Sequence, residues 1–202
     1  MDCQPSPTLT LTEEQLVALR ARYAAERDKR VTRSGQEQYE RPSESASETY
    51  EHDPYLPLTP RAPVVEDLDV AILGGGWTGV LAGYHLAKEG ISTFRHIDHA
   101  GDFGGVWYWN RYPGVQCDND AYCYLPLLEE MDYLPSKKFS DGYEIQAYMA
   151  AIAKKFGFYD NALMHTLVTS LRWNAAMSRW AITTNRGDEI RARFVVMAGG
   201  LM

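Results

Sequence analysis

The chain has 202 residues and a formal net charge of −7, and 12% of its residues are aromatic. This length can bury a core, and the aromatic content excludes an intrinsically disordered protein. The acidic balance speaks against a nucleic-acid-binding surface. The three cysteines are an odd number without metal-ligand spacing, so we predict neither a disulfide framework nor a metal site.

The sequence shows no pattern of an N-terminal signal segment or of a membrane span. The N-terminus lacks a basic region followed by an apolar stretch, and no apolar run approaches the roughly 18 residues of a membrane span. We therefore expect no membrane span, and a cytoplasmic protein with reduced thiols.

Residues 1–66 are predicted to form a helix followed by a proline-rich arm. Thr12 to Gln15 fits a capping box, which predicts a helix as far as Lys29. Its apolar positions share one stripe: Leu16, Leu19 and Tyr23. We expect this stripe to dock on the rest of the chain rather than on a partner. Residues 32–67 have the proline-rich composition of an extended arm.

Residues 67–202 form the second predicted domain, which is organised around a glycine-rich turn. An apolar run from residue 69 ends in the pattern G-x-G-x-x-G, formed by Gly74, Gly76 and Gly79, and an amphipathic pattern follows. We expect Gly74 to permit a sharp turn, Gly76 to leave room for a pyrophosphate, and Gly79 to let helix and strand pack closely. The N–H groups at the helix start would face the phosphates.

A second strand is predicted over residues 91–97, and it ends at Asp98. That carboxylate follows the third glycine by about the 20 positions expected of the acid that binds an adenosine ribose. The pattern predicts a βαβ dinucleotide-binding unit, which serves NAD and FAD equally well.

Residues 101–118 have the pattern of neither a helix nor a strand. Gly104 and Gly105 would let the backbone approach a second part of the ligand, and Trp107, Tyr108 and Trp109 offer flat apolar surface to a ring system. The alternative is that these aromatic residues belong to the core.

A helix capped by Asp141 and Glu144 is predicted to end at Gly157. Strands over 163–173, 180–184 and 189–193 then indicate a small antiparallel meander. Residues 194–198 are continuously apolar, as in a strand buried on both faces, and we expect a continuation that this chain lacks.

These motifs together resemble the flavin-dependent Baeyer–Villiger monooxygenases. They are Gly74-x-Gly76-x-x-Gly79, Asp98, Gly104-Gly105-Val-Trp107-Tyr-Trp-Asn-Arg-Tyr-Pro-Gly114 and Cys117-Asp118. The resemblance covers residues 68–202 and is greatest to fungal members of terpenoid and meroterpenoid pathways. It implies an α/β, Rossmann-like FAD-binding domain, made of a βαβ unit and an antiparallel meander, that is truncated and preceded by a helix and an arm.

The resemblance also implies FAD as the cofactor and assigns residues to its parts. The pyrophosphate would lie on the turn formed by Gly74, Gly76, Trp77, Thr78 and Gly79, with Asp98 at the ribose and Val168 at the adenine. The flavin side would be formed by Val106, Trp107, Tyr108, Trp109, Asp118 and Tyr124. Gln116, Cys117 and Asp118 correspond to the place where flavin and NADPH meet.

Asp118 is the candidate accessory to catalysis, since a buried carboxylate can orient a neighbouring arginine. The alternative is that Asp118 caps the following segment. The family's second dinucleotide-binding unit and its catalytic arginine have no counterpart in this sequence.

The activity implied is oxidation of a ketone to an ester or lactone with NADPH and O2, in secondary metabolism. One alternative is a non-catalytic remnant or FAD-binding module that associates with a complete relative. Another is an NAD(P)-dependent dehydrogenase that uses the same glycine turn.

Overall fold

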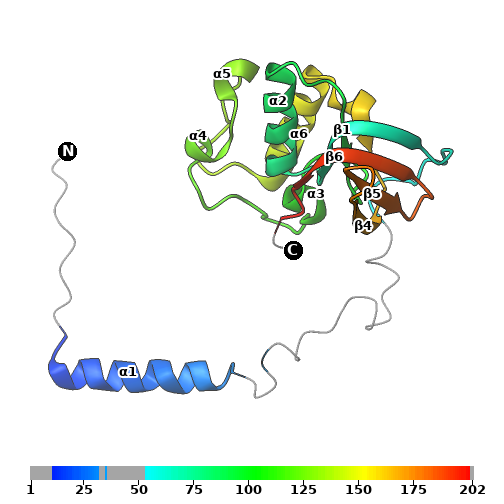
Figure 1. The fold of residues 1–202 in the computed structure, drawn as a ribbon. Coiled ribbons are helices and arrows are strands. Elements are labelled where there is room, and N and C mark those ends of the chain that lie inside the picture. Colours follow the sequence, from blue (N-terminus) through cyan, green and yellow to red (C-terminus); the bar gives the residue numbers. More distant parts are fainter. Residues whose placement is uncertain (1–10, 32–34, 36–52, 201–202) are drawn as a thin grey trace. The chain divides into compact units, whose positions relative to one another are not determined.

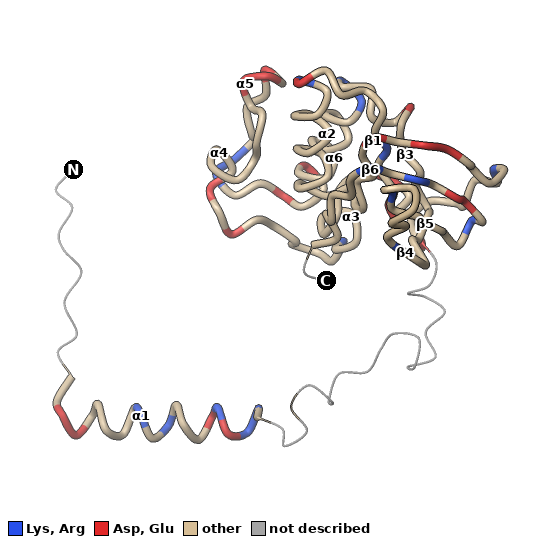
Figure 2. Tube along the Cα trace, viewed as in Figure 1, with Lys and Arg blue, Asp and Glu red and all other residues tan. Residues whose placement is uncertain are grey.

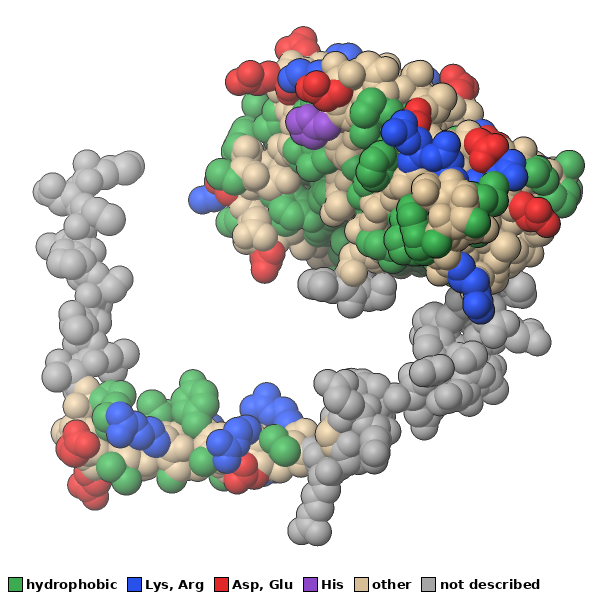
Figure 3. Space-filling view, in the orientation of Figure 1, with side chains coloured by type: hydrophobic (Ala, Val, Ile, Leu, Met, Phe, Trp, Pro, Cys, Tyr) green, Lys and Arg blue, Asp and Glu red, His purple; other side chains and the backbone are tan. Residues whose placement is uncertain are grey.

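The computed structural model describes residues 11–31, 35 and 53–200, in two units, Met1–Glu51 and His52–Met202 (Figure 1). The first unit contains α1 (Glu13–Asp28), which begins with the predicted capping box between Thr12 and Gln15. Within its unit α1 buries none of its residues, and its apolar side chains lie at the surface (Figure 3). The docking of its stripe stays a prediction.

The arm is described from residue 53 onward, and it forms neither helix nor strand between residues 53 and 64, as predicted. The rest of the predicted arm, apart from Gly35, lies outside the described residues. The first strand, β1 (Val65–Leu73), begins directly after the arm.

Six strands of the second unit form one sheet in the order β3-β2-β1-β6-β5-β4. β1 lies between β2 (Phe94–Ile97) and β6 (Glu189–Met197) and is parallel to both. β3 (Ala162–Leu163) adds a short parallel neighbour to β2. This half of the sheet is the predicted βαβ unit with α2 (Trp77–Lys88) as its helix.

The other half of the sheet is the predicted antiparallel meander. β4 (Val168–Asn174) pairs with β5 (Arg179–Thr184), and β5 pairs with the first part of β6. β6 thus joins the two halves, because it is antiparallel to β5 and parallel to β1. The predicted combination of βαβ unit and meander is confirmed.

Two strand predictions were wrong in detail. Residues 163–173 are not one strand, because β3 pairs with β2 whereas β4 pairs with β5, and the chain turns between them at His165 with φ 51°. Residues 189–198 are not two strands but essentially the single strand β6, in which Phe194 and Met197 are 61% and 69% exposed. The apolar run is therefore not buried on both faces, since α2 packs over β1 and β2 instead.

The helices α2 and α6 (Gly142–Lys155) lie side by side next to the sheet (Figure 1). The predicted apolar face of α6 is buried, including Ile145 and Ile152. The predicted cap is not formed: the Asp141 carboxylate accepts hydrogen bonds from Lys137 and Gln116 instead of from the helix N–H groups.

The core consists of two apolar clusters, one involving the helices and one involving the meander. The first joins Ile72 and Val80 to α6, and the second joins Leu73 and Ile97 to Ile182 on β5. Successive residues of β1 supply both clusters, as a strand covered on two faces must. The carboxyl end of β1 is thereby fixed from both sides.

The connection from β2 to α6 contains three single helical turns, α3 (Val106–Trp109), α4 (Ala121–Tyr124) and α5 (Leu128–Met131), and η3 (Phe158–Asn161) follows α6. The segment 101–118, predicted to be irregular, thus contains one turn of helix. The charged residues of β1 are all acidic, and two of them pair with arginines of β6: Asp67 with Arg191 at 2.8 Å and Asp69 with Arg193 at 2.9 Å (Figure 2). Within the described ranges, no helix is long and apolar enough to cross a membrane.

Candidate functional site

The turn between β1 and α2 requires glycine at two of its three motif positions. Gly74 has φ +127°, and a Cβ there would lie 2.3 Å from the carbonyl oxygen of Ala198. A Cβ on Gly79 would lie 2.0 Å from the carbonyl oxygen of Gly74. These two glycines therefore close the turn and let α2 pack on β1, as predicted.

Gly76 has a different environment. It is the N-cap residue of α2 and offers no side-chain acceptor to the first N–H groups of the helix. A Cβ on Gly76 would meet Gly105 Cα at 3.4 Å, an ordinary van der Waals distance. The uncapped helix start is the kind of site that binds an anionic group.

The second glycine pair lies directly against the first turn. The N–H of Gly104 donates to the carbonyl oxygen of Gly75 at 3.0 Å. Gly105 has φ +53°, and a Cβ there would lie 2.8 Å from Gly76 Cα. The backbone of the glycine turn at Gly75 and Gly76 is thus in direct contact with the backbone of Gly104 and Gly105.

Asp98 follows β2 and connects its end to the first turn. One carboxylate oxygen accepts a hydrogen bond from the N–H of Gly75, and the other accepts from the N–H of Ala100 at 2.8 Å. Burial raises the pKa of Asp98, although these backbone hydrogen bonds favour its charged form. The carboxylate retains lone pairs that could accept from a ligand hydroxyl.

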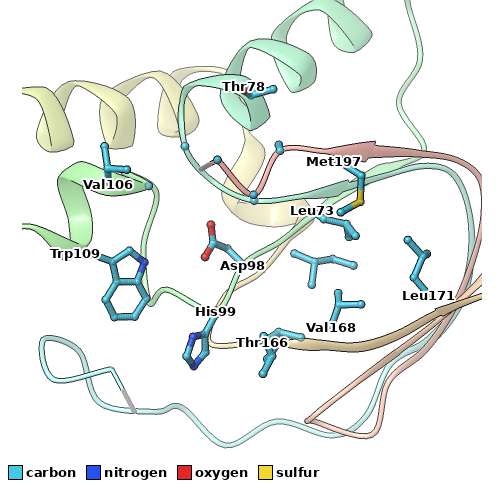
Figure 4. Close-up of a pocket in the computed structure, with 18 of the residues that line it drawn as sticks. Leu73, Thr78, Asp98, His99, Val106, Trp109, Thr166, Val168, Leu171 and Met197 are labelled. Carbon is cyan, nitrogen blue, oxygen red and sulfur yellow. The ribbon is translucent and has the colours of Figure 1, made fainter. Parts of the chain in front are cut away.

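These elements surround a pocket of about 600 Å³. Figure 4 shows Val106 and Trp109 on one side, Val168 and Leu171 on the other, and Asp98 between them. Polar groups of the pocket lie at the glycine turn and at Asp98 and His99, and hydroxyl groups come from Thr166, Thr169 and Ser170 at the start of β4. Its apolar side chains come mainly from strand ends, α3 and β4. The lining residues are Leu73, Gly74, Gly76, Trp77, Thr78, Ile97, Asp98, His99, Gly105, Val106, Trp109 and residues 166–171 and 197–200.

The structure brings together eight of the predicted cofactor residues as pocket lining: Gly74, Gly76, Trp77, Thr78, Asp98, Val106, Trp109 and Val168. Gly79 lies under the turn rather than in the pocket wall. The assignment of these residues to parts of a cofactor stays a prediction.

The other aromatic residues of the second motif do not line this pocket. Tyr108 is fully buried, and its hydroxyl donates to the carboxylate of Asp53. The indole N–H of Trp107 donates to the Tyr124 hydroxyl at 2.8 Å. Part of the motif is thus core, which was the alternative interpretation of these residues.

Gln116, Cys117 and Asp118 lie on a separate segment next to the start of α6. Gln116 forms an isolated bridge with Asp141, and Cys117 is buried in the core. Asp118 is exposed, and the amide of Asn119 donates to it at 3.3 Å. The cap of α4 is Asp120, so the alternative that Asp118 caps the following segment was wrong.

Several lining residues were not predicted from the sequence, chiefly His99, Met197 and those around Val168 on β4. A register shift between Val168 and Ser170 marks this strand start. Such a bulge re-aims side chains, but nothing in the local sequence indicates that it faces the glycine turn. Gly199 and Gly200 could have been found, because ligands bind at the carboxyl ends of parallel strands. Within the described residues, no group of three potential ligands could hold a metal ion.

Known proteins resemble this chain over most of its length. A family model described as NAD(P)-binding Rossmann-like domain matches residues 72–134. Pentalenolactone D synthase of Streptomyces arenae is 48% identical over 189 residues, covering 93% of this chain and 31% of that protein. A Baeyer–Villiger monooxygenase of the fungus Stachybotrys chlorohalonatus is 44% identical over 184 residues, covering 91% and 29%.

Solved structures agree with the sequence relatives. The polycyclic ketone monooxygenase from Thermothelomyces thermophila matches with a TM-score of 0.84 and 31% identity, over 94% of this chain and 33% of that chain. OTEMO in complex with FAD and NADP matches with a TM-score of 0.62 and 27% identity, over 69% and 26%.

The chain spans about 30% of the length of these curated relatives, 31% and 29% for the two named above. The fold of its second unit is the Rossmann-like fold of the monooxygenase FAD-binding domain. The chain is a homologue of the flavin-dependent Baeyer–Villiger monooxygenases.

Proposed function

We propose that this chain is the FAD-binding part of a Baeyer–Villiger monooxygenase and that its pocket holds FAD. The observation that carries the proposal is the meeting of three features at one pocket: the glycine turn, Asp98 and the second glycine pair at Gly105. A relative named FAD-binding monooxygenase, and the structural neighbour OTEMO in complex with FAD and NADP, support FAD as an occupant of this fold.

The residues present fit the phosphate part of such a cofactor. Gly76 leaves the start of α2 without a side chain, so a pyrophosphate could approach the N–H groups there. The Trp77 ring packs against Tyr124 and Tyr148, which do not line the pocket, so its buried indole N–H is not a donor to a ligand there. The donors that the site offers to the phosphates are therefore the backbone N–H groups at the start of α2.

The other parts of the pocket fit the remaining parts of FAD. Asp98 would accept hydrogen bonds from the ribose hydroxyl groups, and Val168 would lie against the adenine. Val106 and Trp109, on the opposite side, would face the flavin end (Figure 4). When bound, FAD would supply the redox chemistry with O2, while these residues hold and orient it.

We propose that the reaction of the complete protein is oxidation of a ketone to an ester or lactone with NADPH and O2, in secondary metabolism. Supporting this are a relative named pentalenolactone D synthase and a neighbour named polycyclic ketone monooxygenase. The cytoplasmic location and the absence of a nucleic-acid partner stay predictions.

A second candidate is FAD binding without catalysis by this chain alone, including association with a complete relative. It is favoured by Asp118, which is exposed and forms no ion pair with an arginine among residues 53–200. The two candidates differ in one assay. Ketone-dependent NADPH consumption by the isolated, flavin-loaded chain supports catalysis, and its absence supports the binding module.

An NAD(P)-dependent dehydrogenase is less well supported. A dehydrogenase of the doubly wound type would continue with further βα units, whereas this chain continues with the antiparallel strands β4 and β5. It would also bind nicotinamide without a yellow chromophore. A visible spectrum of the chain after incubation with FAD and gel filtration separates the two.

A further inference from the structure

Asp53 is a buried carboxylate in the arm, outside the sheet and outside the pocket lining. Its side chain is 3% exposed. One oxygen accepts hydrogen bonds from the backbone N–H groups of Tyr55 at 2.8 Å and Leu56 at 3.3 Å. Such a carboxylate orders the chain that carries it, and its second oxygen is left for other segments.

The second oxygen of Asp53 contacts two separate segments of the domain. It accepts from the N–H of Gly101 at 2.8 Å and from the Tyr108 hydroxyl, and it lies 2.8 Å from His165 Nε2. Because a carboxylate is only an acceptor, that nitrogen of His165 carries the proton. These hydrogen bonds hold the pKa of Asp53 below its usual value although burial acts in the opposite direction.

The partners of Asp53 belong to the two sides of the pocket. Tyr108 lies on α3 between Val106 and Trp109, which line one side. His165 directly precedes Thr166, the first of the lining residues at the start of β4 on the other side. Asp53 Oδ2 therefore links α3, on one side of the pocket, to the segment that leads into β4 on the other side, without lining the pocket itself. Figure 4 shows part of the arm running below His99 and Thr166.

The contact is close and leaves no room for another side chain. A Cβ on Gly101 would lie 2.5 Å from both Asp53 Oδ2 and His165 Nε2. His165 itself has φ +51°, a conformation that a residue with a side chain rarely adopts without support. Its backbone N–H donates to Ala100 at 2.9 Å, so His165 is held at both main chain and side chain.

A neighbouring residue of the arm strengthens the connection to α3. The Tyr55 hydroxyl donates to the carbonyl oxygen of Trp109 at 3.0 Å. The guanidinium of Arg111 lies 3.8 Å from the ring centre of Tyr55 and 4.6 Å from that of Tyr108. Farther along the arm, Arg61 donates to the Thr166 hydroxyl at 3.0 Å.

We propose that Asp53 is a positioning residue that holds the two sides of the FAD pocket, the α3 segment and the start of β4, at a fixed separation. The arm is then part of the cofactor site without touching the cofactor. The role in cofactor binding rests on the proposed function, whereas the connection between the two segments does not.

Hydrogen–deuterium exchange on the full chain tests the connection without cofactor. Asp53→Asn keeps the shape of the side chain but introduces an amide NH2 group, which cannot accept the hydrogen bonds that the carboxylate accepts. Tyr108→Phe removes the hydroxyl group that donates to Asp53 Oδ2. Tyr133→Phe is the matched control, because that hydroxyl donates to the carboxylate of Glu144 at 2.7 Å and neither residue lines the pocket.

We expect Asp53→Asn to speed exchange about tenfold in both segment 101–111 and segment 164–171, while β1 and α6 stay protected. Tyr108→Phe should give a smaller change in the same two segments, and Tyr133→Phe a change in neither. Faster exchange in only one segment, or equally throughout the domain in both Asp53→Asn and Tyr108→Phe, would overturn the proposal.

FAD titration then tests the consequence for the site. We expect Asp53→Asn to weaken FAD binding about tenfold and to alter the visible circular dichroism of bound flavin. The control variant Tyr133→Phe should bind FAD as the wild type does, even if its free energy of unfolding is lowered as much as that of Asp53→Asn. Wild-type affinity in Asp53→Asn would contradict the positioning role. Failure of the wild-type chain to bind FAD would instead contradict the proposed function, and the exchange experiment would still decide the connection.

Discussion

Gly79 packs so closely beneath Gly74 that a Cβ on Gly79 would lie 2.0 Å from the carbonyl oxygen of Gly74. Gly76, between them in sequence, has no such contact, since its Cβ would come no nearer than 3.4 Å to Gly105 Cα. The fold therefore requires glycine at positions 74 and 79, whereas it leaves room for a methyl group at position 76.

This difference predicts opposite outcomes for two alanine substitutions. Gly79→Ala should destabilise the domain by about 2–4 kcal/mol, because the backbone of α2 must move away from β1. Gly76→Ala should keep wild-type stability within about 1 kcal/mol but weaken FAD binding about tenfold, because the methyl group lies where the pyrophosphate would approach. Urea unfolding and flavin titration measure the two effects, and equal FAD affinity in Gly76→Ala and wild type would remove Gly76 from the phosphate site.

The buried imidazole of His96 should make the stability of the domain depend on pH. It is fully buried, with Nε2 3.0 Å from the carbonyl oxygen of Gly79, and burial lowers its pKa to about 4. Between about pH 6.5 and pH 4 the unfolded chain binds a proton that the native chain does not, so this residue makes stability fall with falling pH by at most about 1.4 kcal/mol per unit.

The His96→Asn variant should be less stable at neutral pH but should lose less stability from pH 6.5 to 4 than the wild type. His85→Asn, on the exposed side of α2, is the control for the same chemical change. Unfolding by urea at several pH values gives the slopes. Parallel slopes for His96→Asn and wild type would show that His96 is not the group responsible.

The ion pair between Arg61 and Asp188 predicts that the arm stabilises the domain. Asp188 is fully buried and accepts two hydrogen bonds of 2.6 Å from the Arg61 guanidinium. Burial alone would raise the pKa of Asp188, but the hydrogen bonds from Arg61 and Thr184 lower it below its usual value.

Arg61→Ala should therefore cost about 3 kcal/mol of stability at neutral pH, because it leaves a buried carboxylate without its cation. The loss should shrink below about pH 4, because Asp188 is then protonated in the unfolded chain and the ion pair of the native wild type contributes less to stability. Arg193→Ala removes an exposed ion pair with Asp69 and should change little. Similar losses in both variants would contradict the role given to the buried pair.

Substitution of Asp118 should leave the stability of the folded domain unchanged. It is exposed and contacts Asn119, so Asp118→Asn should change the free energy of unfolding by less than about 0.5 kcal/mol. FAD retention should also match the wild type, because Asp118 does not line the pocket. Loss of flavin in this variant would place Asp118 at the cofactor after all.

The part of the site that could be predicted from the sequence is the part encoded by local backbone chemistry. Gly74 and Gly79 are fixed by contacts within one strand–turn–helix unit, and Asp98 follows from the length of that unit. The Gly104-Gly105 pair was also informative, because only glycine allows its backbone to reach Gly76.

The remaining features depend on contacts between distant segments. The start of β4 reaches the pocket because of the sharp turn at His165, and an αL histidine has no sequence pattern. Asp53 precedes its partner His165 by more than a hundred residues, and the arm looked like a linker by composition. Burial of Phe194 was predicted wrongly because an apolar strand does not show which of its faces a helix will cover.

Flavin retention by the full chain is the most direct test of the account. The purified protein would be incubated with FAD, passed through a gel-filtration column and examined by visible absorption, with far-UV circular dichroism to confirm that it is folded. The account predicts a yellow protein with about one flavin per chain, and much less flavin on the equally folded Gly76→Ala variant. A folded wild-type chain that elutes without flavin would contradict the claim that this pocket is an FAD site.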